Sequence, residues 1–461
     1  MSKIEKFSGS SGVFAWIDRF INMGRGQSYK SFRLDRMRVL CDLACNPERA
    51  APVIHVAGSK GKGSVTGMTA AILNAAGLKT ARYASPDVME KRERISQGNL
   101  FFDESIYAEA GNELAAVVEK LHGLRGPEGR LFDPSREEGE DVTFFELMTL
   151  YFFLCARYAG CDVMAVETGM GGRLDATNIV SPLVTVITLI ELEHTEYLGN
   201  TLGAIAAEKA GIVKAHTPLV LAAQEEEVLA VFRRESLVKD APLLYFPEAA
   251  ETRNVQISRE GTRFSLRLLR EEPEDLQLSV RIPGAVQAHN AGLAVLAARQ
   301  AYPRIGGEDI RKGLEDFSLP ARFEQIMQGP ELVIDGAHTS KSVEQCRDTF
   351  LSLYGEGGIL IFSCTAGKNA EAMAEILAPY FSRIIITTPG TFKKSSPTEL
   401  YRIFGKMTRK NTELLLIPDS AEAVKRALDQ NRNVPILGTG SFYLAAEIRK
   451  YILNRLRTIN P

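Results

Sequence analysis

Short apolar runs alternate with longer stretches of helical periodicity through the first half of the chain. Apolar and β-branched residues predict strands at 53–57, 163–167, 184–190 and 219–223. Between these runs, apolar positions recur at helical spacing over 143–159 and in a segment that ends near Lys209. Strands that alternate with helices in this way predict a parallel sheet with helices on both faces.

The pattern changes in the second half of the chain. Short apolar and polar alternations over 255–282 predict antiparallel strands in a small side sheet. After Pro320 a second series of strand and helix patterns begins, with strands predicted at 332–334, 359–362, 384–387, 414–417 and 435–437. This series predicts a doubly wound, Rossmann-like sheet, although it has no G-x-G-x-x-G fingerprint of a dinucleotide-binding site.

The length of the chain agrees with two separate units. A single hydrophobic core stops growing near roughly 250 to 300 residues, and this chain has 461 residues. We therefore predict one domain over 1–317, a linker at 318–322 and a second domain over 323–461. Positions 121–142 are rich in glycine, proline and charge, which predicts a long loop inside the first domain.

Composition and charge exclude several classes of protein. Lys and Arg number 55 against 57 Asp and Glu, and a formal net charge of -2 offers no basic surface for nucleic acid or an anionic membrane. The most apolar stretch contains Glu146, Arg157 and Asp162, which a membrane span tolerates poorly. The six cysteines lack the spacing of a zinc site or a disulfide scaffold, and the start of the chain has no secretory signal. We expect a cytoplasmic protein.

A glycine-rich segment follows the first predicted strand and precedes a helix. Such a loop lets backbone N–H groups converge on an anion at a helix N-terminus. The residues of this candidate phosphate loop are Gly58, Ser59, Lys60, Gly61, Lys62, Gly63 and Ser64. Lys62 would neutralise phosphate charge, and the Ser64 hydroxyl could bind Mg²⁺. The strict Walker A pattern fails, because Val56 occupies its first glycine position and Gly63 follows the lysine, so an ordinary glycine turn remains an alternative.

Several motifs together resemble one enzyme family. They lie at 55–64, 167–178, 194–201, 207–212, 335–338 and 439–441. In this order they resemble the signatures of the folylpolyglutamate synthase and dihydrofolate synthase family, a branch of the ATP-dependent Mur ligases. The resemblance covers nearly the whole chain. It implies an α/β fold of two domains, in which a P-loop-type ATPase domain with a parallel sheet and a small antiparallel side sheet precedes a Rossmann-like, doubly wound glutamate ligase domain.

The resemblance also implies a set of site residues. Ser64, Glu146 and His194 would hold Mg²⁺ beside the phosphates of ATP, and Lys209 would be carbamylated to orient a second metal ion. ATP would contact the phosphate loop, Asn290, Arg322 and Asp335, and the catalytic residues would be Lys62, Lys209 and His338.

Each of these residues, taken singly, also has a structural interpretation. Glu146 could be a helix carboxylate exposed to solvent, His194 a packing or capping histidine, and Lys209 a surface lysine. Arg322 could form an interdomain ion pair, and Asp335 could cap the end of a strand.

The reaction implied by the resemblance is an ATP-dependent amide ligation. L-glutamate would be joined to the γ-carboxylate of a tetrahydrofolate through an acyl phosphate, and dihydropteroate is a second candidate acceptor. We expect a monomer without nucleic-acid or membrane partners. Two alternatives stay open, a Mur-type ligase for a non-folate acid and a nucleotide-binding protein without ligase activity. The chain departs from the family pattern at Asp87, Glu193, Thr339, Ser340 and the segment 367–369, and these departures leave the acceptor open.

Overall fold

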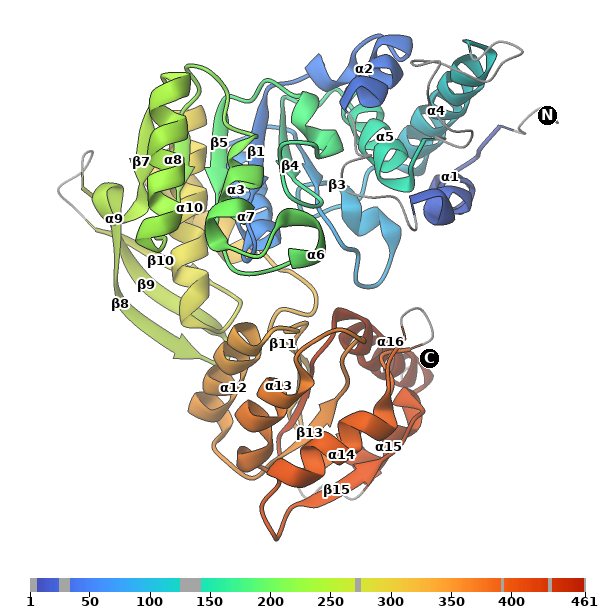
Figure 1. Ribbon diagram of the computed structural model, residues 1–461, viewed down its shortest axis with the longest axis vertical. Helices are drawn as coiled ribbons and strands as arrows, with labels where there is room; N and C mark the ends of the chain where they lie inside the picture. The colour runs from blue at the N-terminus through green and yellow to red at the C-terminus, as the bar shows by residue number, and fades with distance from the viewer. Residues whose placement is uncertain are drawn as a thin grey trace.

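The structure is a computed structural model that describes residues 6–24, 34–124, 142–269, 275–390, 394–429 and 433–459. Figure 1 shows two α/β halves, the N-terminal half above the C-terminal half, with a smaller sheet at the side of the upper half. The chain therefore has the two-part α/β fold that its sequence predicts.

The N-terminal half is built on a seven-stranded sheet in the order β3-β2-β4-β1-β5-β6-β7. The strands are β1 Val53–Ala57, β2 Thr80–Tyr83, β3 Ile95–Gln97, β4 Val163–Glu167, β5 Val184–Ile187, β6 Leu219–Leu221 and β7 Leu243–Tyr245. All neighbouring strands pair in parallel except β2 and β3. The predicted parallel sheet is confirmed.

Helices cover both faces of this sheet. They are α1 Ser10–Ile17, α2 Leu34–Leu43, α3 Lys62–Ala75, α4 Glu104–Leu124, α5 Phe144–Tyr158, α6 Thr195–Leu198, α7 Leu202–Ala210, α8 Glu226–Lys239, α9 Phe246–Ala249, α10 Ala285–Ala301 and α11 Gly307–Asp316. Successive strand residues point to opposite faces, so Val53 shares a core with α4 and α5, whereas Ile54 and Val56 share one with α3 and α10. A third core lies between the sheet, α7 and α8.

The side sheet has the order β10-β9-β8, and its strands β8 Ala250–Ser258, β9 Gly261–Leu268 and β10 Leu276–Val280 are antiparallel. Its apolar side chains, including Phe264 and Leu266, share a core with α10. In Figure 1, β8 and β9 extend from the upper half towards α12 of the lower half. The predicted side sheet is confirmed.

The C-terminal half contains a six-stranded sheet in the order β11-β12-β16-β13-β14-β15. Its strands are β11 Glu324–Met327, β12 Leu332–Ile334, β13 Gly358–Phe362, β14 Phe381–Ile386, β15 Glu413–Leu416 and β16 Ile436–Thr439. Its helices are α12 Ser340–Tyr354, α13 Ala370–Leu377, α14 Pro397–Met407, α15 Ser420–Asp429 and α16 Phe442–Ile459. Only β11 is antiparallel to its neighbour among these described strands. The predicted doubly wound sheet is confirmed.

Some elements differ from the sequence-based expectation. The predicted loop at 121–142 lies mostly outside the described residues, and its first residues belong to α4, which ends at Leu124. The proposed linker at 318–322 falls between α11 and β11, and the domain division there stays a prediction. No helix in the described ranges is long and apolar enough to cross a membrane.

Candidate active site

The candidate phosphate loop connects the central strand β1 to the N-terminus of α3. Gly58 and Gly61 have φ angles of 150° and 89°, a region that side chains disfavour. A Cβ on Gly58 would lie 1.9 Å from Thr188 Oγ1, and one on Gly61 would lie 2.6 Å from Asn290 Oδ1. Both positions therefore require glycine, and the side chains of Thr188 and Asn290 pack closely against the loop. The unpaired N–H groups in the first turn of α3 favour an anion at this position.

Two lysine side chains converge on this loop from different helices. Lys62 Nζ donates to the carbonyl oxygen of Gly58 at 2.9 Å, and Lys209 Nζ donates to the same oxygen at 2.8 Å. Lys209 comes from α7 and is only 1% exposed. The structure thus brings together the two lysines that the sequence singles out.

Glu193 shares this environment. Its Oε1 accepts a hydrogen bond from Lys209 Nζ at 3.0 Å. Burial lowers the pKa of Lys209 to about 8, although the Glu193 carboxylate opposes the shift. For Glu193 burial favours the neutral acid, but Lys62 and Lys209 outweigh it and lower the pKa to about 2. This departure from the family pattern places an ionised carboxylate against Lys209.

Glu167 is a site residue that the sequence analysis missed. It ends β4 and pairs in register with Val56 of β1, one residue before that strand ends. Its Oε2 lies 3.5 Å from the position of a Cβ on Gly63 and accepts the Ser85 N–H at 3.3 Å. Burial raises the pKa of Glu167, and Lys62 acts in the opposite direction. A glutamate at the carboxyl end of a central parallel strand was the signal that could have identified it.

Glu146 occupies a different environment from the one expected. Both of its carboxylate oxygens accept from Arg36 Nε, at 2.7 and 2.9 Å, and its Oε2 also accepts from the backbone N–H and the hydroxyl of Thr143. Glu146 closes a capping box at the start of α5. Within the described ranges, no hydrogen bond or ion pair joins it to the phosphate loop. The alternative of a solvent-exposed helix carboxylate is wrong, because Glu146 is 5% exposed, and the metal role of Glu146 stays a prediction.

The remaining predicted metal ligands lie on two short segments. Ser64 is in the first turn of α3 and is 3% exposed. His194 precedes α6 with a left-handed φ of 48°, directly after Glu193, and its side chain is exposed. Ser59 Oγ donates to the Glu191 carbonyl oxygen at 3.0 Å, which ties the loop to the segment that carries His194.

The C-terminal half contributes Arg322, Asp335 and His338. Asp335 accepts the backbone N–H groups of Phe323 and Ala337 at 2.8 and 2.7 Å, so it does cap the end of β12. The Arg322 guanidinium lies 4.5 Å from the centre of the Phe442 ring. Burial lowers the pKa of Arg322, while the carboxylates of Asp335 and Glu167, one from each half, oppose the shift.

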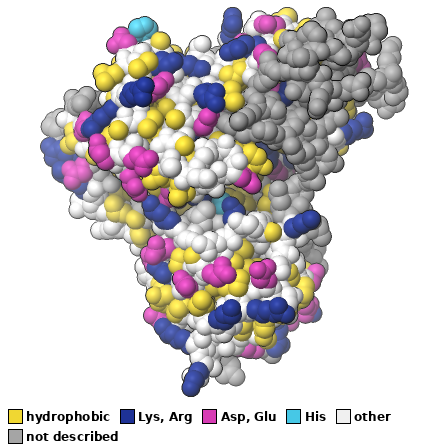
Figure 2. All heavy atoms as spheres, in the orientation of Figure 1, with side chains coloured by type: hydrophobic (Ala, Val, Ile, Leu, Met, Phe, Trp, Pro, Cys, Tyr) yellow, Lys and Arg dark blue, Asp and Glu magenta, His cyan; other side chains and the backbone are white. Residues whose placement is uncertain are grey.

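His338 is a neutral imidazole of the C-terminal half. Burial, followed by the Lys60 ammonium, lowers the pKa of His338 to about 3. Its Nδ1 donates to the Gly336 carbonyl oxygen at 2.9 Å, which leaves Nε2 as a hydrogen-bond acceptor. Lys341 Nζ also reaches Glu191 Oε1 at 3.2 Å across the junction. Figure 2 shows the molecule narrowing between its halves, with a histidine and basic side chains in the recess.

Asn290 lies on α10 and is 6% exposed. Its Oδ1 lies next to Gly61, and its Nδ2 donates to Gln287 Oε1 at 3.3 Å. Asn290 therefore lies against the phosphate loop, whereas Glu146 forms its contacts with Arg36 and Thr143.

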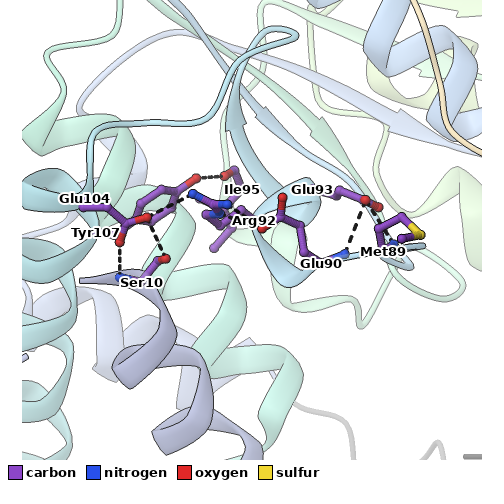
Figure 3. Close-up of polar contacts among 8 residues, drawn as sticks. All are labelled: Ser10, Met89, Glu90, Arg92, Glu93, Ile95, Glu104 and Tyr107. Carbon is purple, nitrogen blue, oxygen red and sulfur yellow. Dashed lines mark hydrogen bonds and ion pairs between the residues drawn. The ribbon is translucent and has the colours of Figure 1, made fainter. Parts of the chain in front are cut away.

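The segment around Asp87 forms a charged network beside the recess. The Glu93 carboxylate accepts the N–H groups of Val88, Met89 and Glu90 at 2.6, 3.0 and 3.3 Å, and Figure 3 shows it facing Met89 and Glu90. Asp87 forms an ion pair with Arg94.

The same network reaches the outer helices. In Figure 3, Arg92 bridges Glu90 and Glu104, and Glu104 also accepts the N–H and hydroxyl of Ser10 in α1. Tyr107 donates to the Ile95 carbonyl oxygen at 2.5 Å. Internal ion pairs thus fix this segment where the family pattern differs.

Comparisons with known proteins place the chain in a family. The Mur ligase middle domain matches residues 106–298, and the Mur ligase glutamate ligase domain matches 321–441. The dihydrofolate synthase/folylpolyglutamate synthase of Bacillus subtilis is 31% identical over 425 residues, covering 90% of this chain and 94% of the relative.

Solved structures agree with the sequence relatives. Folylpolyglutamate synthase of Mycobacterium tuberculosis, complexed with ADP and AMPPCP, has a TM-score of 0.84 and 26% identity, covering 96% of this chain and 99% of that one. An FPGS–AMPPCP–folate complex has a TM-score of 0.77 and 26% identity, covering 96% and 100%. The chain belongs to the folylpolyglutamate synthase and dihydrofolate synthase family of Mur ligases.

Proposed function

We propose that the protein is an ATP-dependent ligase that joins L-glutamate to the γ-carboxylate of a tetrahydrofolate. The observation that carries this proposal is the convergence of Lys62 and Lys209 on the Gly58 carbonyl oxygen, in the loop that precedes α3. Family membership supplies the reaction class. Dihydropteroate is the second acceptor we propose to test, because the Bacillus subtilis relative carries both activities in its name.

ATP would bind with its phosphates at the N-terminus of α3, with Lys62, Asn290, Arg322 and Asp335 around the nucleotide. Ser64, Glu167 and His194 would hold Mg²⁺, and Glu167 replaces Glu146 in this proposal. Carboxylate and hydroxyl oxygens suit Mg²⁺, and one imidazole is admissible. Bound there, Mg²⁺ would neutralise phosphate charge. No three His, Cys, Asp or Glu side chains in the described part of the chain cluster as a metal site, which suits an ion that takes most ligands from phosphate and water.

The reaction would proceed in two displacements. The acceptor carboxylate attacks the γ-phosphorus of ATP, which forms an acyl phosphate and releases ADP. The glutamate amine then attacks the acyl carbon, loses a proton and displaces phosphate. Lys62 would stabilise charge on the transferred phosphoryl group. His338, neutral and with Nε2 free to accept, would orient the amine rather than act as a strong base, since its pKa is about 3.

Lys209 would be carbamylated in the working enzyme. Its burial and its pKa of about 8 favour the neutral amine that reacts with CO₂. The carbamate is an anion and would repel the Glu193 carboxylate. Glu193 would therefore have to point away from Lys209, or bind the same cation as the carbamate. Intact-protein mass spectrometry and ¹³C NMR with labelled CO₂ test this step, and an active enzyme with unmodified Lys209 would overturn it.

A product assay tests the proposed activity. The protein is incubated with ATP, Mg²⁺, labelled L-glutamate and a panel of tetrahydrofolate, dihydropteroate and non-pterin carboxylic acids. We expect ADP, phosphate and a product heavier by one glutamyl residue, with ¹⁸O from the acceptor carboxylate recovered in phosphate. Product from only a non-pterin acid would favour the Mur-type alternative. Nucleotide binding without product from any acid would favour a non-catalytic protein.

Three further properties remain predictions. Light scattering tests the expected monomer, cell fractionation tests the cytoplasmic location, and limited proteolysis tests a domain division within 318–322.

A further inference from the structure

The motif at 167–178 packs its backbone against the end of α7. Arg173 N donates to the Glu208 carbonyl oxygen at 2.7 Å. A Cβ on Gly172 would lie 2.9 Å from that oxygen and 3.0 Å from Lys209 Cα, and one on Gly211 would lie 2.5 Å from Arg173 Cα. Both contacts leave room only for glycine, so the loop and the last turn of α7 are in direct contact.

Asn178 joins these two segments through its side chain. Its Nδ2 donates to the carbonyl oxygens of Arg173 and Gly211, both at 3.0 Å. Lys214 Nζ donates to the Asn178 carbonyl oxygen at 3.0 Å and to its Oδ1 at 2.7 Å. The side chain is 6% exposed. This arrangement requires an amide, because one end must donate to two carbonyl oxygens while the other accepts from a cation.

The turn that Asn178 holds is the one that carries Lys209. Glu208, which accepts from Arg173, precedes Lys209, and Gly211 follows it by two residues. The lysine side chain extends from this turn to the phosphate loop, where Nζ lies 2.8 Å from the Gly58 oxygen. A displacement of about 1 Å in a catalytic group can cost on the order of 100-fold in rate. The position of the turn therefore sets the position of the ammonium group.

We propose that Asn178 is a positioning residue for Lys209, which acts by clamping the end of α7 to the loop at 172–173. It touches neither nucleotide nor acceptor in this assignment. The inference rests on the proposed function only in that Lys209 takes part in the ligation. Lys214 orients the amide and supports the clamp.

The first test is the isosteric variant Asn178→Asp, which keeps the volume and the partner of Lys214 but turns a carboxylate oxygen towards two carbonyl oxygens. We expect kcat to fall by about 10- to 100-fold, with little change in the KM for ATP because the phosphate loop and Lys62 are untouched. Asn112→Asp is the matched control, since Asn112 also bridges to a backbone, that of Phe7, at 2.8 Å. The control should keep wild-type kcat.

A double-mutant cycle separates positioning from general damage. In a Lys209→Ala background, Asn178→Asp should change the residual turnover by less than about twofold, because the group it positions is absent. An undiminished loss in that background would overturn the proposal. If Asn178→Asp fails to fold, Lys214→Met serves in its place, with a smaller expected fall in kcat and the same dependence on Lys209.

A crystal structure of Asn178→Asp gives a result that does not depend on ligase activity. We expect Lys209 Nζ to leave its contact with the Gly58 oxygen while β1 and α3 keep their positions. An unmoved Lys209 would overturn the positioning role. Wild-type protein that is inactive on every acceptor would instead contradict the proposed function, and the structural result would still decide the role of Asn178.

Discussion

At the scale of single residues, two lysine ammonium groups and one glutamate carboxylate lie around the Gly58 carbonyl oxygen, and their charges partly cancel. Lys62 and Lys209 both donate to Gly58, and Glu193 neutralises part of their charge at 3.0 Å from Lys209. Such a cluster is costly to desolvate unless its groups are paired. The Gly58 oxygen accepts from both ammonium groups, and Glu193 pairs with that of Lys209.

The two glutamates give opposite expectations on substitution. Glu167→Gln should lower kcat at least tenfold and raise the Mg²⁺ concentration needed for half-maximal rate, because an amide neutralises no cation charge. Glu146→Gln should keep turnover but lower the free energy of unfolding by about 3 to 5 kcal/mol, since Arg36 loses its buried partner. Mg²⁺ titrations of initial rate and urea unfolding of both variants measure these effects. Loss of Mg²⁺ dependence in Glu146→Gln alone would restore the original assignment.

The metal carboxylate shows where sequence reasoning reached its limit. Glu146 and Glu167 are both glutamates of the N-terminal half, and sequence order cannot tell which of them lies nearer the phosphate loop. The parallel pairing of β1 and β4 sets Glu167 beside Val56, near the phosphate loop, and this position is the reason that we propose Glu167. The capping box of Thr143 and Glu146 was readable in the sequence and gives the same carboxylate a structural role.

His55 gives a pH-dependent stability. It is 0% exposed, its Nε2 bonds Thr177 Oγ1 at 2.8 Å, and its Nδ1 has no hydrogen-bond partner in the described part of the chain. Burial lowers its pKa from 6.5 to about 3. Between these values the unfolded state binds the extra proton, so His55 lowers stability as pH falls, by about 1.4 kcal/mol per pH unit.

Urea unfolding of His55→Gln between pH 6.5 and pH 4.5 measures this effect. The slope of unfolding free energy against pH should be smaller than in wild type, whatever the change in absolute stability. Equal slopes would show that His55 is protonated in the folded state.

At the scale of elements, the central parallel strands were more predictable than most of the short strands near the sheet edges. Strands β1, β4 and β12 run where the apolar runs predicted, because both faces of a central parallel strand are buried and its sequence is continuously apolar. The missed strands β2, β3, β7 and β11 are short, and β3 and β11 lie at sheet edges and pair antiparallel. Pairing with neighbouring strands, rather than the apolar pattern of their own sequences, makes these segments strands.

The turn from β1 into α3 can be tested with two glycines of similar φ. Gly61→Ala places a methyl group 2.6 Å from Asn290 Oδ1 at a φ of 89°, whereas Gly77 has a φ of 85° with no atom within 4 Å of a new Cβ. Both substitutions should cost about 1 to 2 kcal/mol for the left-handed backbone. Only Gly61→Ala should add a clash and raise the KM for ATP, as thermal unfolding and initial rates would measure. Equal effects of the two substitutions would contradict an enclosed loop.

At the scale of the whole molecule, the proposed nucleotide site is divided between the two halves. The phosphate loop belongs to the first, Arg322 and His338 to the second, and Lys341 pairs with Glu191 across the junction at 3.2 Å. A ligand that contacts both halves stabilises both of them, so the two halves should unfold together when it is bound. The site would therefore be complete only when the halves lie together, and water could be excluded from an acyl phosphate there.

Calorimetry with a non-hydrolysable ATP analogue and Mg²⁺ tests this division. A ligand at 100 times its Kd stabilises the folded state by about 2.7 kcal/mol, and this gain should appear in one transition of the intact chain. Lys62→Ala should remove most of it, because the phosphates lose their cation. Arg322→Ala should also reduce it, whereas Arg409→Ala, 62% exposed at the side chain and paired only with Glu356 among the described residues, should not. If Arg322→Ala kept the full stabilisation while Lys62→Ala lost it, the nucleotide would be held by the N-terminal half alone, and the two-sheet site would be wrong.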